Sequence, residues 1–255
     1  MQLGMMNDPQ RNALEEARWA AGHGFDFLDL TIEGPAAARE QIDARAIRQV
    51  LADAGMGVVG HTAWFLPLAS PIERVRRAAI EEVVATLPIF AGLGATLVNV
   101  HIARTVKTFG PEATARFNGA SFAELAERAE PYGIRIMAEH PPDPGVSIAD
   151  IRAILQADER LGFHLDVGHA NVGSDRLEEL LNAFADRLCH VHLSDNRGRD
   201  DDHMPLGAGN IDWRRAIRLI KHSGYDGTIT LEVFAQERDY LLQSAEKVRQ
   251  WWAEA

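Results

Sequence analysis

The chain has 255 residues, a mass of 28.1 kDa and a hydrophobic fraction of 46%, which is enough to bury a large core in one or two domains. Its formal net charge of −11 disfavours a general polyanion binder, and its single cysteine, Cys189, excludes a disulfide framework. No run of eighteen apolar residues predicts a membrane span, and the first residues reach charge and proline too early for a signal peptide. We therefore expect a soluble, cytoplasmic protein without a membrane partner.

Strand-like and helix-like segments alternate from one end of the chain to the other, with no low-complexity linker between them. Eight apolar segments that end in polar residues are predicted strands: 1–6, 25–33, 55–64, 96–103, 134–142, 161–171, 188–196 and 227–234. Apolar residues recur at helical spacing in 72–93, where Pro88 should introduce a kink, and in 241–252. Eight such units predict an α/β fold, a (β/α)8 TIM barrel forming a single domain over residues 1–255. A doubly wound open sheet is the alternative, but no glycine-rich phosphate motif follows the first strand.

Five of the predicted strands have one aliphatic and one polar face, because successive side chains of a strand point to opposite sides. In segment 161–171, Leu165 and Val167 share one face, while His164 and Asp166 share the other. The aliphatic face should contact the helices, so the polar face should point into the barrel. Several unpaired charges buried there would be strongly unfavourable, and a bound metal ion would compensate them.

Polar residues at or just beyond the strand ends form a candidate metal site at one mouth of the barrel. Its members are His61, His101, Glu139, Asp166, His169, His192 and Glu232, with Asp201 and His203 from the loop after the seventh strand. Imidazole nitrogens and carboxylate oxygens without thiolates favour zinc, manganese or a similar divalent ion. The ligands exceed what one ion needs, so the sequence predicts one to three ions.

Several neighbouring residues have simpler interpretations. His164 and His190 lie deeper on the inward face, where hydrogen bonding inside the barrel is expected. His140 points away from the polar face of its strand and is expected to be structural or to support the site. Trp64 could either cover the mouth or pack against its own loop.

These segments resemble the xylose isomerase-like TIM barrels, a family that includes sugar isomerases and epimerases and the DNA-repair enzyme endonuclease IV. The resemblance covers nearly the whole chain, and its most specific motifs are AEHPPDPG, HLDVGHAN, HVHLSD, DDHMPLGAGNIDW and LEVF. In the epimerase branch it implies a metal ion bound by Glu139, Asp166, His192 and Glu232, with His169 near the substrate. In the endonuclease branch it implies three zinc ions, and the ligand positions of that branch match all nine residues of the candidate metal site.

Other residues near the mouth bear on the choice between these branches. Glu33 stands where the endonuclease pattern would offer a basic residue for DNA, and a carboxylate there suits sugar hydroxyls. Trp64 resembles the aromatic residue that the endonuclease loop carries after its histidine. The arginine that the epimerase pattern places six residues after the seventh-strand histidine is replaced by Gly198, between Arg197 and Arg199. The candidate substrate-binding residues are Glu33, Trp64, Arg197 and Arg199.

The interpretation that we favour is a divalent-metal-dependent isomerase or epimerase acting on a sugar, or on a related hydroxy-carbonyl compound or polyol. The ion would stabilise an enediolate while Glu139 and Glu232 remove and return a proton, and His169 is the third candidate catalytic residue. The partner of such an enzyme is a small sugar-like molecule, and a homo-oligomer is compatible with it.

Two alternatives remain open. The first is a zinc phosphodiesterase of the endonuclease IV type that acts at abasic sites in DNA. DNA binding needs a basic track, but Arg104 and Lys107 near the mouth are accompanied by Glu33, Asp200 and Asp202. Three bound ions would offset part of the negative charge, so net charge does not exclude this activity. The second alternative is a barrel that binds metal and a ligand without turnover.

Overall fold

Eight parallel strands close into a barrel in which each strand pairs with the next along the chain and β8 returns to β1. This architecture comes from a computed structural model that describes residues 1–110 and 112–255. The predicted (β/α)8 TIM barrel and all eight predicted strands are confirmed. The strands are β1 (Gln2–Met6), β2 (Phe27–Ile32), β3 (Gly57–Thr62), β4 (Leu97–His101), β5 (Arg135–Glu139), β6 (Gly162–Asp166), β7 (Leu188–Leu193) and β8 (Thr228–Leu231).

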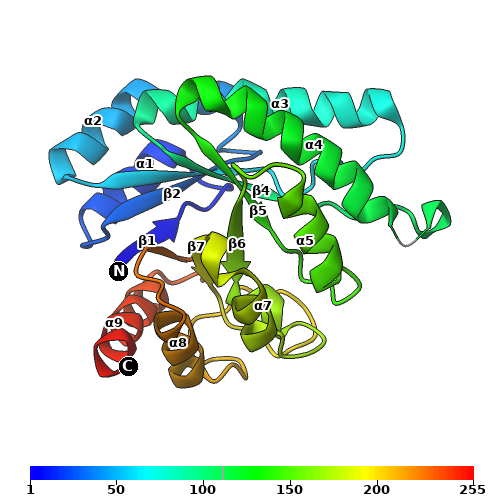
Figure 1. Cartoon of the computed structure of the whole chain (residues 1–255). Helices are drawn as coiled ribbons and strands as arrows, with labels where there is room; N and C mark the ends of the chain where they lie inside the picture. Colours follow the sequence, from blue (N-terminus) through cyan, green and yellow to red (C-terminus); the bar gives the residue numbers. More distant parts are fainter. Residues whose placement is uncertain (111) are drawn as a thin grey trace.

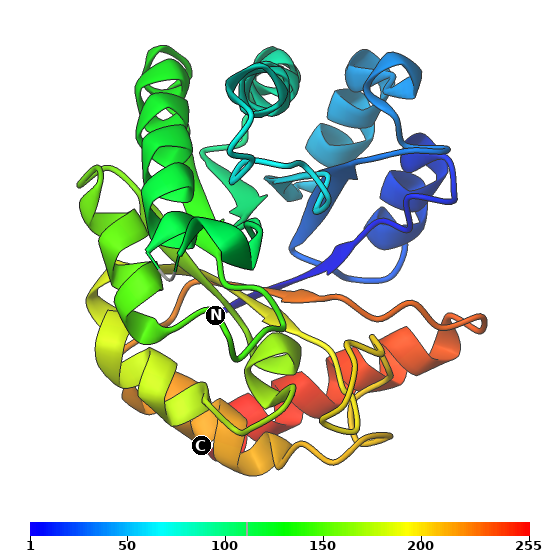
Figure 2. The ribbon, with the colours of Figure 1, turned by 90° about the vertical axis from the view of Figure 1, so that its right-hand side faces the viewer.

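Helices cover the outside of the barrel, and Figures 1 and 2 show them ringing the strands with both termini on the same side. They are α1 (Ala13–Ala21), α2 (Ala44–Ala54), α3 (Glu73–Leu93), α4 (Ala113–Ala129), α5 (Ile148–Gln156), α6 (Val167–Asn171), α7 (Leu177–Phe184), α8 (Trp213–His222) and α9 (Asp239–Glu254). Polar caps start several of them; Ser147, for example, forms a capping box with Asp150 at the start of α5. Helix α3 continues through Pro88. None of the helices in the described ranges is long and apolar enough to cross a membrane.

The two faces of the strands separate as the alternation predicts. Outward-facing residues such as Leu28, Leu30, Val98 and Ile229 are buried in the main hydrophobic core with the helices. Inside the barrel, Phe27, Val59 and Met137 form a small separate apolar cluster near the amino ends of their strands, and the half-buried Cys189 packs against it. Gly4 lies beside this cluster, where a Cβ atom would overlap the ring of Phe27. The interior therefore changes from apolar to polar along the strands.

The sixth strand is shorter than the sequence predicts. It ends at Asp166, and the short helix α6 begins at Val167. Asp166 caps this helix, because its Oδ1 accepts a hydrogen bond of 2.7 Å from the backbone N–H of His169. Val167 is therefore helical, although it stays buried in the core as expected. The turn keeps His169 at the mouth instead of carrying it outward along an extended strand.

Candidate metal and active site

The carboxyl ends of the strands meet at one mouth of the barrel, the end that Figure 2 turns toward the viewer. The register sets His101 beside Glu139 across β4 and β5, and Asp166 beside His192 across β6 and β7. The mouth opens into a cavity of about 1040 Å³. Six members of the candidate metal site line it: His61, His101, His169, Asp201, His203 and Glu232. The other three, Glu139, Asp166 and His192, are fully buried and contact four of these six, His61, His101, His169 and Glu232.

Glu139 lies at the centre of a group of histidines. Its Oε2 is 3.1 Å from Nε2 of His101, 3.7 Å from Nε2 of His61 and 3.5 Å from Nδ1 of His164. The two Nε2 atoms of His61 and His101 are 3.2 Å apart. On the other side, Oε1 of Glu139 is 3.3 Å from Nδ1 of His169. Histidines therefore lie on both sides of this carboxylate.

A second group forms around His192. Its Nδ1 lies 2.9 Å from Oε2 of Glu232 and 3.8 Å from Oδ2 of Asp166. Ligand atoms of Glu139, Asp166 and His192 all lie within 4.8 Å of one another, as do those of His61, His101 and Glu139. The two groups share Glu139.

The loop after β7 brings Asp201 and His203 to the same mouth. Oδ2 of Asp201 is 3.0 Å from Nε2 of His169 and 3.2 Å from Nε2 of His203. The backbone of His203 is left-handed, with φ of 47°, and its Nδ1 lies 3.7 Å from Oε1 of Glu232. All nine residues that the sequence predicted for the metal site thus lie around one mouth.

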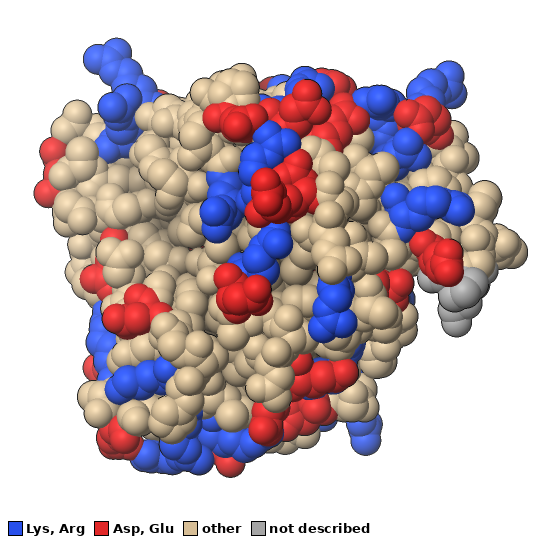
Figure 3. Space-filling model, in the orientation of Figure 1, with Lys and Arg blue, Asp and Glu red and all other residues tan. Residues whose placement is uncertain are grey.

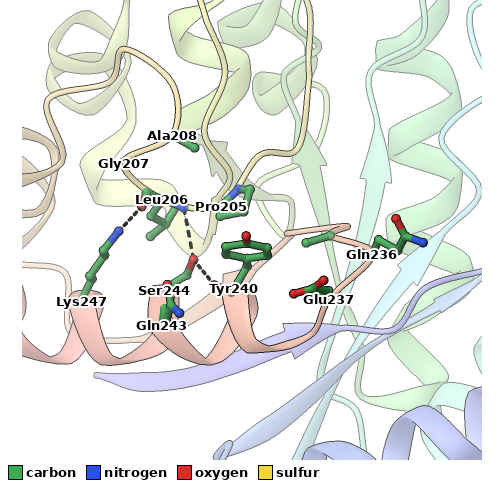
Figure 4. Close-up of a pocket in the computed structure, with 11 residues that line it drawn as sticks. Pro205, Leu206, Gly207, Ala208, Gln236, Glu237, Tyr240, Gln243, Ser244 and Lys247 are labelled. Carbon is green, nitrogen blue, oxygen red and sulfur yellow. Dashed lines mark hydrogen bonds between the residues drawn. The ribbon is translucent and has the colours of Figure 1, made fainter.

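Helix α9 anchors this loop, as the close-up in Figure 4 shows. Lys247 Nζ donates a hydrogen bond of 2.6 Å to the carbonyl of Leu206, and the backbone N–H of Leu206 donates one of 3.1 Å to Ser244 Oγ. These contacts line a second cavity of about 530 Å³ next to the mouth. Because Leu206 is three residues from His203, its attachment to α9 restricts where the imidazole can lie.

Several buried polar atoms at the mouth have no hydrogen-bond partner within residues 1–110 and 112–255. They are Glu139 Oε1, Asp166 Oδ2, Asp201 Oδ1 and His203 Nδ1. Buried polar groups are normally satisfied, so a cluster of unsatisfied polar atoms, three of them carboxylate oxygens, is an environment that suits a bound cation. The donor set of carboxylate oxygens and imidazole nitrogens fits a divalent ion of the zinc or manganese type.

The pKa of Asp166 indicates that several negative charges are crowded in this cluster. Burial, reinforced by nearby carboxylates and only partly opposed by His169, raises the pKa of Asp166 to about 7. Burial alone would raise the pKa of Glu139 as well, but the surrounding histidines outweigh it and hold that pKa well below its usual range. Burial lowers the pKa of His101 to about 4, so its imidazole is neutral at pH 7. A divalent cation would favour ionisation of Asp166.

The walls of the cavity combine carboxylates and aromatic rings. Glu33 is half-buried there, and burial raises its pKa. The side chains of Trp64 and Phe65 also line the cavity and are 63% and 57% exposed, with ring centroids 5.8 Å apart. Trp64 therefore faces the opening instead of being buried under its own loop. Phe234 lines the cavity and is 39% exposed.

Positive charge at the mouth is placed differently from the sequence-based expectation. Arg197 and Arg199 are exposed and are absent from the described cavity lining, because the chain folds back on itself at Asp195 and Met204. Arg11 and Arg104 line the cavity instead. The side chain of Lys107 lies outside the described part of the structure.

Both lining arginines contact a carboxylate. Nε of Arg11 is 3.3 Å from Oδ2 of Asp8, and Arg104 forms an ion pair with Asp143. Basic and acidic side chains are also interspersed over the side of the barrel drawn in Figure 3. Among the described residues, these contacts leave the cavity wall without the unpaired basic track that a phosphate backbone requires.

The remaining inward histidines have the expected structural contacts, and one carboxylate of the interior was missed. His190 Nδ1 lies 2.7 Å from Oγ1 of Thr228, and His140 Nε2 lies 3.1 Å from the carbonyl oxygen of Asp166. Asp29, on β2, is fully buried and lies 2.8 Å from Nε2 of His192. Its inward parity was a signal that could have identified it, but it lies three residues before the end of β2.

Comparisons with known proteins agree with this geometry. Residues 17–254 match the xylose isomerase-like TIM barrel family. An uncharacterized protein of Methanocaldococcus jannaschii is 29% identical over 83% of this chain and 76% of its own length, and fructoselysine 3-epimerase of Escherichia coli O157:H7 is 24% identical over 98% of each chain. The crystal structure of a D-tagatose 3-epimerase-like protein superposes with a TM-score of 0.84 at 25% identity, covering 98% of this chain and 97% of the other. The chain therefore belongs to the xylose isomerase-like TIM barrel family.

Proposed function

We propose that this protein is a divalent-metal-dependent isomerase or epimerase of a sugar or a related hydroxy-carbonyl compound. The observation that carries the proposal is the buried group of Glu139, Asp166 and His192, whose ligand atoms lie within 4.8 Å of one another and which Glu232 joins through His192. Relatives of known activity, such as fructoselysine 3-epimerase, belong to the same reaction class.

Glu139, Asp166, His192 and Glu232 would hold the first ion, and His61 and His101 with the shared Glu139 would hold a second. A third would need His169, Asp201 and His203. The IolI protein, which shares the fold with a TM-score of 0.80 at 18% identity, was crystallised with a zinc atom, which supports zinc as one candidate besides manganese. When bound, such an ion would act as a Lewis acid that polarises the substrate carbonyl and stabilises negative charge on its oxygen.

The proton transfer falls to Glu139 and Glu232. Glu139 ends β5 and Glu232 follows β8, three strands away around the barrel, so the two carboxylates would approach a substrate from different sides of the mouth. One carboxylate takes the proton from the carbon next to the carbonyl, and the electron pair of the broken C–H bond forms an enediolate. Return of a proton to the opposite face of that carbon produces the epimer, and return to the former carbonyl carbon produces the isomer. Nδ1 of His169, 2.8 Å from the carbonyl oxygen of His140, donates to it, and Nε2 lies 3.0 Å from Oδ2 of Asp201.

The walls of the cavity favour an uncharged sugar. Glu33 supplies a hydroxyl acceptor at the rim, and Trp64 offers an exposed ring against which the C–H face of a sugar can pack. The arginines of the wall already have carboxylate partners, which disfavours a substrate that depends on phosphate recognition.

The test is exchange of substrate hydrogen with solvent. Metal-loaded protein incubated in heavy water with a panel of ketoses and hydroxy-carbonyl acids should label the carbon next to the carbonyl of at least one compound. Removal of the ion with a chelator should abolish the label, and restoring the ion should return it. A broad panel without any label, using protein shown to contain metal, would contradict the proposal.

Endonuclease activity at abasic sites is the second candidate, because all nine ligand positions of that branch gather at one mouth and Trp64 is exposed beside them. We expect no tight binding to intact duplex DNA, since the basic residues of the wall are paired with acids. A salt titration with intact and abasic duplexes measures this. Nicking of the abasic strand that is lost in Glu139→Gln protein would reverse the ranking of the two activities.

A further inference from the structure

Asp29 lies one layer below the mouth, on the inward face of β2, with both of its ionic partners on the far side of the barrel. Its Oδ2 is 2.8 Å from Nε2 of His192 and 3.2 Å from Nε2 of His190. Thr230 Oγ1 donates a third hydrogen bond of 2.8 Å to the same oxygen. Asp29 is fully buried, and a carboxylate in such a place is retained at low energy only when donors surround it.

The contact determines which nitrogen of His192 carries hydrogen. An ionised carboxylate only accepts hydrogen bonds, so Nε2 of His192 must donate to Asp29. In a neutral imidazole the lone pair is then on Nδ1, which lies 2.9 Å from Oε2 of Glu232 and 3.8 Å from Oδ2 of Asp166. A bare lone pair facing two carboxylates would be repelled, so this nitrogen needs either a second proton or a cation beside it, and a metal ion that replaces the proton would attract all three groups.

We propose that Asp29 is a positioning residue that holds His192 in the tautomer with hydrogen on Nε2 and aims the lone pair of Nδ1 at the metal ion. The inference rests on the proposed function, because it requires the metal site. It assigns a role to a carboxylate that would not itself bind the ion. Such outer carboxylates fix the orientation of a ligating imidazole and increase its basicity, and losing one weakens metal binding about 10- to 100-fold.

The neighbouring histidines suggest two other roles, a structural contact between Asp29 and His190 and an ion bound deeper in the barrel. His190 contacts the same carboxylate, but its second nitrogen lies 2.7 Å from Oγ1 of Thr228, and this pair serves the interior of the barrel. His164, His190 and His192 also have ligand atoms within 4.8 Å of one another. An ion among these three that used Nε2 of His192 would have to displace the hydrogen that this nitrogen donates to Asp29.

The first experiment needs no variant. In zinc-loaded, ¹⁵N-histidine-labelled protein, two-bond ¹H–¹⁵N spectra should show His192 bound through Nδ1, with a hydrogen on Nε2 shifted downfield by its bond to a carboxylate. Zinc on Nε2 of His192 would overturn the proposal, because the ion would then lie in the deeper layer with His164 and His190.

The second experiment measures zinc and manganese affinity by competition with a chromophoric chelator. Asp29→Asn should weaken binding about 10- to 100-fold and remove the downfield Nε2 signal, while circular dichroism shows an intact fold. Thr230→Val is the matched control, since it removes the contacts of Oγ1 with Asp29 and His190 but no hydrogen bond of the His192 side chain, and its affinity should change by less than about threefold.

The outcomes distinguish a failure of the proposed function from a failure of the role assigned to Asp29. Wild-type protein that binds no divalent ion would remove the proposed function and this inference together. Wild-type protein that binds the ion, with folded Asp29→Asn protein binding it equally well, would overturn only the role of Asp29. If Asp29→Asn does not fold, the spectrum of the wild-type protein still decides the question.

Discussion

Ile136 and Glu139 lie three residues apart on β5, and both are almost completely buried, with 1% and 0% exposure. Ile136 points outward into the main hydrophobic core, whereas Glu139 points inward among His61, His101 and His169. The outer face gains free energy from burial, because its atoms leave water for a close-packed apolar environment. The inner face holds charges that need partners. Stability and chemistry are therefore carried by opposite faces of the same strand, and substitutions should separate them.

The largest effect is expected inside the barrel. Glu139→Gln keeps the size of the side chain but removes the base and one charge of the ligand set, so the rate of solvent-hydrogen exchange should fall by about two to four powers of ten. Glu232→Gln should behave similarly. The labelling rate in heavy water measures both variants. An exchange rate within tenfold of wild type in Glu139→Gln protein would show that this carboxylate is not the base.

On the outer face, Ile136→Ala should lower the free energy of unfolding by about 2–5 kcal/mol, because it leaves a cavity between β5 and the helices. Urea denaturation measures this, and Ile136→Val, with an expected loss of about 0.5–1.5 kcal/mol, is the graded control. The folded variant should keep the exchange rate of wild type. A rate that falls in proportion to the loss of stability would mean that the two faces are not independent.

Metal affinity should depend on pH through the inner face alone. The pKa of Asp166 is raised to about 7, and that of His192 is raised well above its usual value despite burial, because Asp29 and Glu232 stabilise the imidazolium. Both groups must lose their proton to act as ligands, so affinity is lost as pH falls. For each proton that the ion must displace, binding should weaken about tenfold per pH unit below the pKa of the group that carries the proton. Chelator competition at pH 6, 7 and 8 tests this, and a flat profile would contradict it.

The smallest effect is expected at the rim. Glu33→Gln should raise KM about 3- to 10-fold, the range for one hydrogen bond, with little change in kcat. Steady-state kinetics on the labelled substrate separate the two constants. A larger fall in kcat than rise in KM would assign Glu33 to proton transfer instead of substrate binding.

Much of the fold and of the metal site was predictable because both depend on local alternation. Each inward polar residue near a strand end, such as His101 or Asp166, was identified from its parity and its position along one strand. The end of the sixth strand was predicted wrongly, because a side-chain cap at Asp166 starts a helix where the apolar pattern continues. Of the two cavity arginines, Arg104 was expected near the mouth, but Arg11 was missed because it lies in a loop, whose path no periodicity describes.

The sequence by itself determined the eight strands, their two faces and the identity of the polar residues at one mouth, because the direction of a side chain along a strand is a local property of the backbone. Only the tertiary structure decided which of these residues meet. Asp29 and His192 are 163 residues apart and come into contact across the interior of the barrel, and His61 reaches Glu139 from a strand two places away. Such contacts depend on closure, tilt and register of all eight strands together, and no single segment of the chain encodes them.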